Sequence, residues 1–321
     1  MRRFVLFVAG VCLCGAMFAG VHKVPQSAPE PDRSAGLFVG VRDFPEDDEL
    51  NPVKYAVDDA IDLAYELAMS HQPRLVPPDR VVLALSGSAQ KPESQKRLEQ
   101  LQAAGAVVDD ASQAHILKLL HKQASVVGGR GVLFVSFATH GISQDGVQYL
   151  LTQTSLHDEV ETAITDTKMR DIIAKRADRS LIVIDACRER LRRDNRTGIP
   201  DPQSRAAFLH GLDEIHGQVV LSAATPGNYA YDDDDRKNGV FTATLIDALR
   251  CGGATPNAQG VITADAVATF VEAHVLTWVR QHKDPELKKA TQRQFDGRSN
   301  EMPLTICPVT RTVASASHLQ P

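Results

Sequence analysis

The sequence predicts an α/β protein with a mostly parallel sheet and helices on both faces. Short apolar runs alternate along the chain with segments in which apolar residues recur at helical spacing. The run Leu181–Asp185 is typical of these strands, because consecutive apolar residues lead into a charged one, as in strands buried on both faces of a parallel sheet. No break in composition divides positions 36–308, so we expect a single domain there.

Six strands are predicted from the apolar runs. They lie at 36–41, 81–85, 131–137, 181–185, 218–222 and 302–306, with a small hairpin near 148–152. Each interval between the first five strands is long enough for a helix that crosses from one strand to the next, and an order of strand, helix and strand favours parallel pairing.

Helices are predicted in the intervals from caps and periodicity. Asn51-Pro52 is typical of a helix start and predicts a helix that runs to Ser70, followed by a surface helix at 93–104. Two glycine pairs end helices: Gly128-Gly129 ends a helix with Ile116, Leu117 and Leu120, and Gly252-Gly253 ends the helix that begins at Gly239. Two further helices are capped at their starts by Thr165 and Thr263.

The amino-terminal residues have the form of an export signal. Two arginines precede an uncharged apolar run at 4–21, so we expect a signal peptide or signal anchor at 1–21 and a linker at 22–35. The protein is then periplasmic or secreted, and it contacts a membrane only if residues 4–21 remain as an anchor. The net charge of −5 gives no indication of nucleic-acid binding, and residues 309–321 are expected to be a disordered tail.

The cysteine count favours one free thiol. Of five cysteines, Cys12 and Cys14 lie in the predicted signal, which leaves Cys187, Cys251 and Cys307. An odd number in an exported chain suggests a free reactive thiol. Cys251 could pair with Cys307, and Cys187 would then be the free cysteine.

The chemistry of the chain centres on His140 and Cys187. Both follow predicted strands, they are 47 residues apart, and one hairpin, one helix and one strand fit between them. Because neighbouring parallel strands end at the same edge, the imidazole could activate the thiol. The backbone N–H groups of Gly141 and Cys187 could form an oxyanion hole. Alternatively, Cys187 is a packing residue and His140 is bonded to a carbonyl.

These motifs resemble those of the caspase-like cysteine peptidases. Thr139-His140-Gly141 followed by Asp185-Ala186-Cys187-Arg188 is similar to the histidine and cysteine of that family, with aspartate at 185 as in metacaspases. The resemblance implies a caspase-like three-layer sandwich with a mostly parallel six-stranded sheet. It also implies peptide-bond hydrolysis by a dyad of Cys187 and His140. We expect no required cofactor, although some metacaspases require calcium.

Two aspartates predict a basic P1 preference. Asp185 lies two residues before Cys187, so both side chains share one side of the sheet, where a carboxylate favours Arg or Lys at P1. The resemblance places Asp59 in the same pocket, although Asp59 could equally be a solvated helix residue. Ala56 and Ala138 stand where metacaspases tend to have cysteine and serine, which leaves the depth of the pocket open.

Two charged stretches have weaker functional interpretations. The Arg-rich loop at 188–205 could be cut by the enzyme itself after Arg193 or Arg196, or it could be a solvated loop. The run Asp232, Asp233, Asp234 and Asp235 could bind Ca²⁺, but it lacks the spacing of an EF-hand loop, which favours a solvated acidic loop near the cleft. The expected partners are protein or peptide substrates.

Two other functional hypotheses remain open at this point. A catalytically silent caspase-fold module used for binding or regulation would have the same fold, although both dyad residues are present. A non-peptidase thiol enzyme is also compatible with the sheet, but no cofactor motif supports it.

Overall fold

The computed structural model describes residues 30–70, 74–144, 147–187, 217–225, 227–295 and 299–307. The predicted signal at 1–21, most of the linker, the tail at 309–321, and Arg193 and Arg196 lie outside the described residues.

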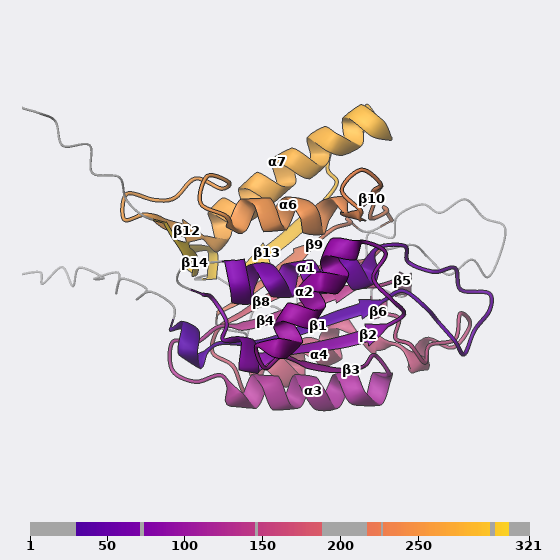
Figure 1. Ribbon diagram of the computed structural model, residues 1–321. Helices are drawn as coiled ribbons and strands as arrows, with labels where there is room; N and C mark the ends of the chain where they lie inside the picture. The colour runs from indigo at the N-terminus through magenta and orange to yellow at the C-terminus, as the bar shows by residue number, and fades with distance from the viewer. Residues whose placement is uncertain are drawn as a thin grey trace, which may run out of the picture.

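The main sheet has seven strands in the order β13-β9-β8-β4-β1-β2-β3 (Figure 1). Every neighbouring pair is parallel except β13 with β9. The strands are β1 (Ala35–Val41), β2 (Val81–Ser86), β3 (Val107–Asp110), β4 (Leu133–Ala138), β8 (Ser180–Asp185), β9 (Gln218–Ser222) and β13 (Gln292–Phe295). The α/β class and the mostly parallel sheet are confirmed.

Both edges of the sheet differ from the prediction of six strands. The segment predicted as the sixth strand is β14 (Pro303–Ile306), which pairs antiparallel with β12 (Val261–Thr263) in a separate small sheet. Its expected place at the edge is taken by β13, and the short strand β3 forms the opposite edge. Neither β3 nor β13 is an apolar run, because an edge strand is not enclosed on all sides.

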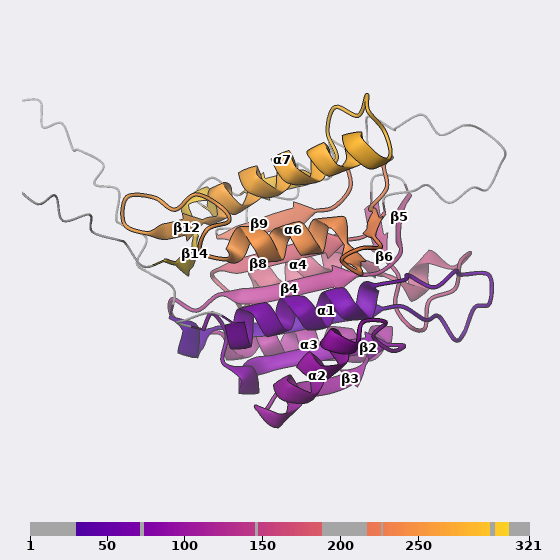
Figure 2. The same ribbon diagram turned by 45° about the horizontal axis from the view of Figure 1, so that its top comes forward.

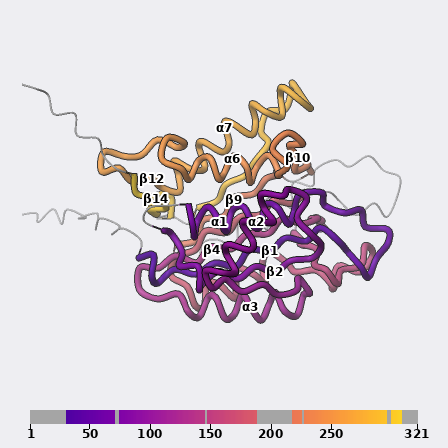
Figure 3. The backbone as a smooth tube through the Cα atoms, viewed as in Figure 1, coloured from indigo at the N-terminus to yellow at the C-terminus, as the bar shows by residue number. Residues whose placement is uncertain are grey.

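Helices cover both faces of the sheet, which gives three layers (Figures 2 and 3). One apolar core lies between the sheet and α1, α2, α6 and α7, and a second lies between the sheet and α3 and α4. The helices are α1 (Ala56–Tyr65), continued by a π-helical turn (Glu66–Ser70), α2 (Pro92–Ala103), α3 (Gln113–Val126), α4 (Asp166–Ala174), α6 (Val240–Leu249) and α7 (Ala264–His282).

Two predicted helix caps are present, and one predicted helix start is wrong. The hydroxyls of Thr165 and Thr263 accept hydrogen bonds from the backbone N–H groups of Lys168 and Ala266. Helix α1 begins at Ala56 and not at Asn51-Pro52, so Asn51 lies in the loop before the helix. This loop becomes important at the site.

Short hairpins extend from the carboxyl end of the sheet. Strands β5 (Gly141–Gln144), β6 (Val147–Leu150) and β7 (Ile164–Thr165) form one small sheet, and β10 (Asp232–Asp233) pairs with β11 (Asn238–Gly239). A disulfide between Cys251 and Cys307 joins the segments after α6 and β14, which is the pairing that the cysteine count allowed but did not determine. Within the described ranges, no helix has the length and apolar character needed to cross a membrane.

Candidate active site

Strands β4 and β8 bring His140 and Cys187 to neighbouring positions. The two strands pair in parallel up to Ala138 opposite Asp185, and the Thr139 N–H continues the ladder to the Asp185 carbonyl at 3.2 Å. His140 and Cys187 are the second residues after this last pair. Neighbouring strands are about 4.8 Å apart, so the two residues lie over one edge of the sheet.

Gly141 packs directly against the backbone of Cys187. A Cβ atom on Gly141 would overlap the Cys187 carbonyl oxygen and lie 3.0 Å from the Cβ of Ala186. Because the nearest obstacle is backbone, the close approach of the histidine and cysteine segments requires a glycine here.

His140 is held by a loop that precedes α1, which we call the 42–55 loop. The ring of Phe44 stacks on the imidazole, with centroids 5.3 Å apart, and His140 Nε2 lies 2.7 Å from the Asn51 carbonyl oxygen. A carbonyl only accepts, so Nε2 carries the hydrogen and donates it. In the neutral imidazole, Nδ1 is then the basic nitrogen. One ring nitrogen of His140 is therefore bonded to a carbonyl, as in the alternative interpretation, while the other nitrogen remains available for proton transfer.

Cys187 is partly exposed, and within the described part of the chain it is the cysteine that does not form a disulfide. Its Sγ accepts a hydrogen bond from the Ala230 N–H at 3.4 Å. The thiol also donates to the Ala230 carbonyl oxygen at 3.9 Å, so Ala230 contacts the sulfur through both of its backbone polar groups. Tyr231 follows directly, and its ring lies 6.4 Å from that of Trp278. Burial, and after it the charges of Asp284 and Cys187, raise the pKa of Tyr231.

Asp185 and Asp59 converge on Gly239 at the start of α6. Both aspartates are buried, with 7% and 4% of their surface exposed. Asp185 Oδ2 accepts hydrogen bonds from the Thr242 N–H at 3.2 Å and the Thr242 hydroxyl at 2.7 Å. Asp59 Oδ1 accepts from the Gly239 N–H at 2.9 Å. A Cβ atom on Gly239 would lie 2.5 Å from Asp185 Oδ2 and 3.0 Å from Asp59 Oδ2. Asp59 is thus not a solvated helix residue.

Burial and nearby negative charge raise the cost of ionising both carboxylates. Burial raises the pKa of Asp185 to about 6, and the charge of Asp232 acts in the same direction. Burial, followed by the charge of Asp185, raises the pKa of Asp59 well above its usual value. Like charges in a low dielectric cannot both ionise easily, and a cation placed between them removes this penalty.

Further buried polar groups orient Asp59. Asn238 Nδ2 donates to Asp59 Oδ1 at 3.0 Å and to Asp62 Oδ2 at 3.1 Å. Asp62 in turn forms ion pairs with Lys91 at 2.6 Å and Arg97 at 2.8 Å. Sequence reasoning gave Asn238 no role, because it is separated from Asp59 by 179 residues and no local pattern links them. Ala56 and Ala138 are both buried.

The four consecutive aspartates span β10 and the start of the turn that leads to β11, and their carboxylates do not form a converging group. Asp234 Oδ1 is bound by Lys54 Nζ at 2.6 Å and by the Tyr55 hydroxyl at 2.8 Å, while Asp233 Oδ1 accepts backbone N–H groups of the turn. Calcium binding there remains a prediction.

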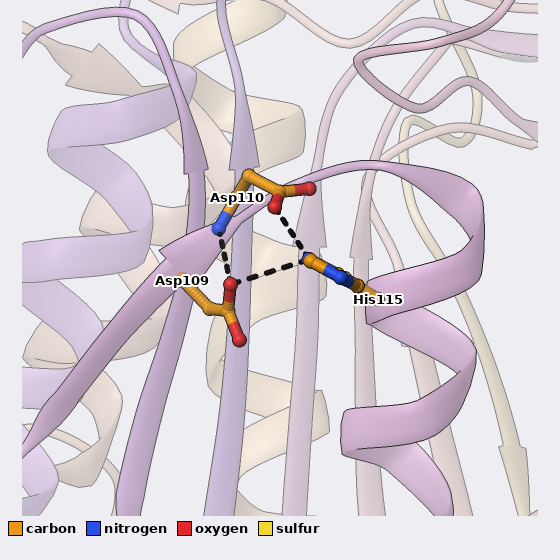
Figure 4. A group of neighbouring side chains, drawn as sticks. All are labelled: Asp109, Asp110 and His115. Atoms are coloured by element: carbon orange, nitrogen blue, oxygen red, sulfur yellow. Dashed lines mark hydrogen bonds and ion pairs between the residues drawn. The ribbon is translucent and has the colours of Figure 1, made fainter.

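A different group, Asp109, Asp110 and His115, has converging ligand atoms (Figure 4). It is the one such group of three or more in the ranges that the structure describes. It lies at the end of β3, three strands away from β4, and its side chains pair with one another.

Comparisons with known proteins identify the fold and the family of the chain. The model of the caspase domain family, Peptidase_C14, matches residues 84–296. No curated protein matches the chain.

Solved structures with the same fold include two caspases. Caspase-1 of Spodoptera frugiperda is 14% identical, with a TM-score of 0.51, over 85% of this chain and 90% of that one. The Drosophila initiator caspase Dronc is 12% identical, with a TM-score of 0.51, over 95% and 98%. A protein of Geobacter sulfurreducens is 13% identical, with a TM-score of 0.50, over 85% and 96%. At these identities the structures show the fold alone. The family model covers well over half of the sequence, and the chain therefore belongs to the caspase domain family of cysteine peptidases.

Proposed function

We propose that this protein is a cysteine endopeptidase that cleaves after Arg or Lys. The observation that carries the proposal is the pair of buried carboxylates, Asp59 and Asp185, of which Asp185 ends the strand that leads into Cys187. The neighbouring positions of His140 and Cys187 support the hydrolytic chemistry, and the carboxylates support the preference for a basic side chain.

The catalytic cycle follows from the dyad. His140 Nδ1 takes the proton of the Cys187 thiol, and the resulting thiolate attacks the scissile carbonyl carbon. This gives a tetrahedral intermediate, whose oxyanion is stabilised by the backbone N–H groups of Gly141 and Cys187. His140 donates its Nδ1 proton to the leaving amine, and a thioester with Cys187 remains. His140 then takes a proton from water, which attacks the thioester, and the acid and the thiol are released.

The P1 preference rests on charge. A guanidinium or ammonium group near Asp185 and Asp59 would neutralise two carboxylates that disfavour each other's ionisation. An acidic P1 side chain would add a third negative charge to the same buried region and is expected to be rejected.

Export and self-processing complete the proposal. The disulfide between Cys251 and Cys307 supports an oxidising compartment, in agreement with the signal predicted at 1–21. We infer that the protein is periplasmic or secreted, or tethered by residues 4–21. Its basic preference makes Arg193 and Arg196 candidate points of self-cleavage in the 188–205 loop.

Fluorogenic peptides that differ only at P1 test the proposal. Wild type and Cys187→Ala are compared on Arg, Lys, Gln and Asp substrates, with calcium and with EDTA. We expect turnover of the Arg and Lys peptides by wild type alone. Turnover of the Asp peptide alone would overturn the proposed specificity. Comparing the rates with calcium and with EDTA tests the prediction of calcium binding.

Iodoacetamide distinguishes an inactive enzyme from a binding module. The absence of turnover, together with no alkylation at Cys187, would favour a catalytically silent module. For self-processing, wild type and Cys187→Ala are incubated and their amino termini are sequenced. New termini after Arg193 or Arg196 in wild type alone are expected, and an intact, fully active single chain contradicts self-processing.

A further inference from the structure

His140 takes its orientation from two residues of the 42–55 loop. Phe44 stacks on one face of the imidazole, and the Asn51 carbonyl accepts the Nε2 hydrogen. The base of the loop is closed by the Val53 N–H to the Arg42 carbonyl at 3.0 Å. Because both contacts with His140 come from this one loop, the orientation of the imidazole depends on what holds the loop in place.

Asp47 lies between Phe44 and Asn51 and organises the loop. Its backbone N–H donates to the Phe44 carbonyl at 3.1 Å, and its carbonyl accepts from the Leu50 N–H at 3.3 Å. Its side chain also accepts from the Glu49 N–H at 2.9 Å. These bonds build consecutive turns, so a displacement of Asp47 is transmitted to both residues that contact His140.

The Asp47 carboxylate anchors the loop to His157. Asp47 is only 8% exposed. Its Oδ2 accepts from the His157 backbone N–H at 2.6 Å and lies 2.8 Å from His157 Nδ1. The backbone bond from His157 contributes most to lowering the pKa of Asp47, and the Asp47 side chain raises the pKa of His157. The pair is therefore a charge-assisted contact with two donors on one oxygen, which is among the stronger kinds of hydrogen bonding.

His157 belongs to the part of the chain that follows the His140 hairpin. Gly141 begins β5, β5 pairs with β6, and residues 151–159 continue from β6. This segment is itself well held, because the Leu156 N–H donates to the Thr162 hydroxyl at 3.0 Å and Leu156 forms a bridge with Glu159. The anchor thus joins the loop that orients His140 to the hairpin that begins directly after it.

The other end of the loop has a weaker anchor. Lys54 and Tyr55 bind Asp234 in the acidic turn, but the side chains of Lys54 and Asp234 are 56% and 72% exposed. Exposed ion pairs contribute little, whereas a buried carboxylate that loses its partners costs much more. Asp47 is therefore the anchor whose loss matters more.

We propose that Asp47 and His157 are positioning residues that hold the 42–55 loop so that Asn51 and Phe44 orient His140 for proton transfer. This proposal rests on the proposed function, since it assigns His140 its catalytic role. Neither residue touches the reacting atoms, and both act through the loop. A misplacement of about 1 Å in a catalytic group can reduce a rate by roughly 100-fold, so loss of the anchor should be visible in kcat.

The test compares Asp47→Ala, Asp47→Asn and His157→Ala with Asp48→Ala. Asp48 is the matched control, because it is the adjacent loop residue, is exposed and carries the same charge. Each variant is assayed with an Arg peptide, active sites are counted by titration with a thiol-reactive peptide, and Cys187 alkylation by iodoacetamide is followed against pH.

We expect kcat per active site to fall about tenfold or more in Asp47→Ala, with KM changed less than about twofold. Asp47→Asn should recover part of the rate, because its amide oxygen still accepts a hydrogen bond. His157→Ala should have a smaller effect, since its backbone N–H remains. Asp48→Ala should match wild type. The dependence of Cys187 alkylation on pH should change in Asp47→Ala alone, or most strongly in that variant, because a displaced His140 would alter the environment of the thiolate.

A purely structural role would reduce the number of active sites and leave kcat per site and the alkylation profile unchanged, and that result would overturn the proposal. If Asp47→Ala does not fold, His157→Ala decides in the same way. If wild type hydrolyses no peptide, the proposed function fails, while the alkylation profiles still show whether Asp47 controls the environment of Cys187.

Discussion

Asp59 and Asp185 direct their carboxylates toward the same glycine, Gly239, and their hydrogen bonds within the described residues come from neutral groups. Thr242 donates to Asp185, while Asn238 and the Gly239 N–H donate to Asp59. The nearby cations Lys91 and Arg97 are paired with Asp62 instead. Two buried carboxylates with no cation among their partners in the described ranges are costly to maintain, and this cost is understandable if a substrate supplies the cation.

Replacing Asp185 by asparagine should reduce cleavage after arginine. The asparagine side chain keeps an oxygen for the Thr242 donors but loses the charge, so we expect kcat/KM for an Arg peptide to fall about 100-fold, mainly through KM. The matched peptide with Gln at P1 is the control, and its kcat/KM should change less than about threefold. An equal loss on both peptides would show that Asp185 supports the fold of the site and not the recognition of charge.

The preference for arginine should increase with pH. Burial raises the pKa of Asp185 to about 6, so the carboxyl is largely neutral at pH 5 and ionised at pH 7. We expect the ratio of kcat/KM for the Arg and Gln peptides to rise across this range, because ionisation adds the charge that binds the guanidinium. The ratio cancels any effect of pH on the chemical step, because that effect is common to both peptides. A ratio that stays constant in wild type would contradict the assignment.

Stability should show the opposite dependence on pH. An aspartate whose folded pKa is raised binds its proton more tightly in the folded state, so the folded protein loses stability as pH rises from 3.8 to about 6. Asp185→Asn should therefore be more stable than wild type at pH 7, by up to roughly 3 kcal/mol at 1.36 kcal/mol per pKa unit. At pH 4 the two proteins should unfold at the same denaturant concentration. A variant that is less stable than wild type at both pH values would exclude the proposed burial cost.

The central strands could be predicted from the sequence, and the edge strands could not. Buried parallel strands such as β4 and β8 are enclosed on both faces, so they must be apolar runs, and their ends located His140 and Cys187. The edge strand β13 reads Gln-Arg-Gln-Phe, and its pairing with β9 depends on tertiary structure. The apolar run at β14 predicts a strand of the main sheet, but β14 pairs with β12 instead, because apolar character does not specify which sheet a strand joins.

The support of the site also depends on contacts between distant segments. Asn51 and Pro52 have the local chemistry of a helix start, yet the helix begins at Ala56, and the Asn51 carbonyl binds His140, which is 89 residues away. Asp59 could be placed near Asp185 only through resemblance, since a helical aspartate has the same local pattern whether it is solvated or buried. Local sequence identifies reactive residues more readily than the groups that orient them.

The disulfide should contribute stability without affecting catalysis. Cys251 and Cys307 are 56 residues apart in the sequence, and cross-linking a loop of this length stabilises a protein by about 4 kcal/mol in the chain-entropy description. The bond lies beyond the end of α6 opposite Gly239, about 15 Å along the helix. Cys251→Ser with Cys307→Ser should lower the free energy of unfolding by roughly this amount while kcat per active site is retained. A loss of kcat in the folded double variant would place the disulfide among the supports of the active site.

Gly141→Ala should separate the two members of the dyad. Its new methyl group would overlap the Cys187 carbonyl oxygen and press on Ala186, and because the oxygen is backbone, no side-chain rotation can relieve the overlap. We expect kcat to fall by about 100-fold as His140 and Cys187 move apart, with a stability loss of about 1 to 3 kcal/mol. Gly128→Ala is the matched control, since a methyl group there meets nothing within 4 Å. Unchanged kcat in Gly141→Ala would mean that the backbone yields without disturbing the dyad, and the close packing of Gly141 on Cys187 would then have no role in catalysis.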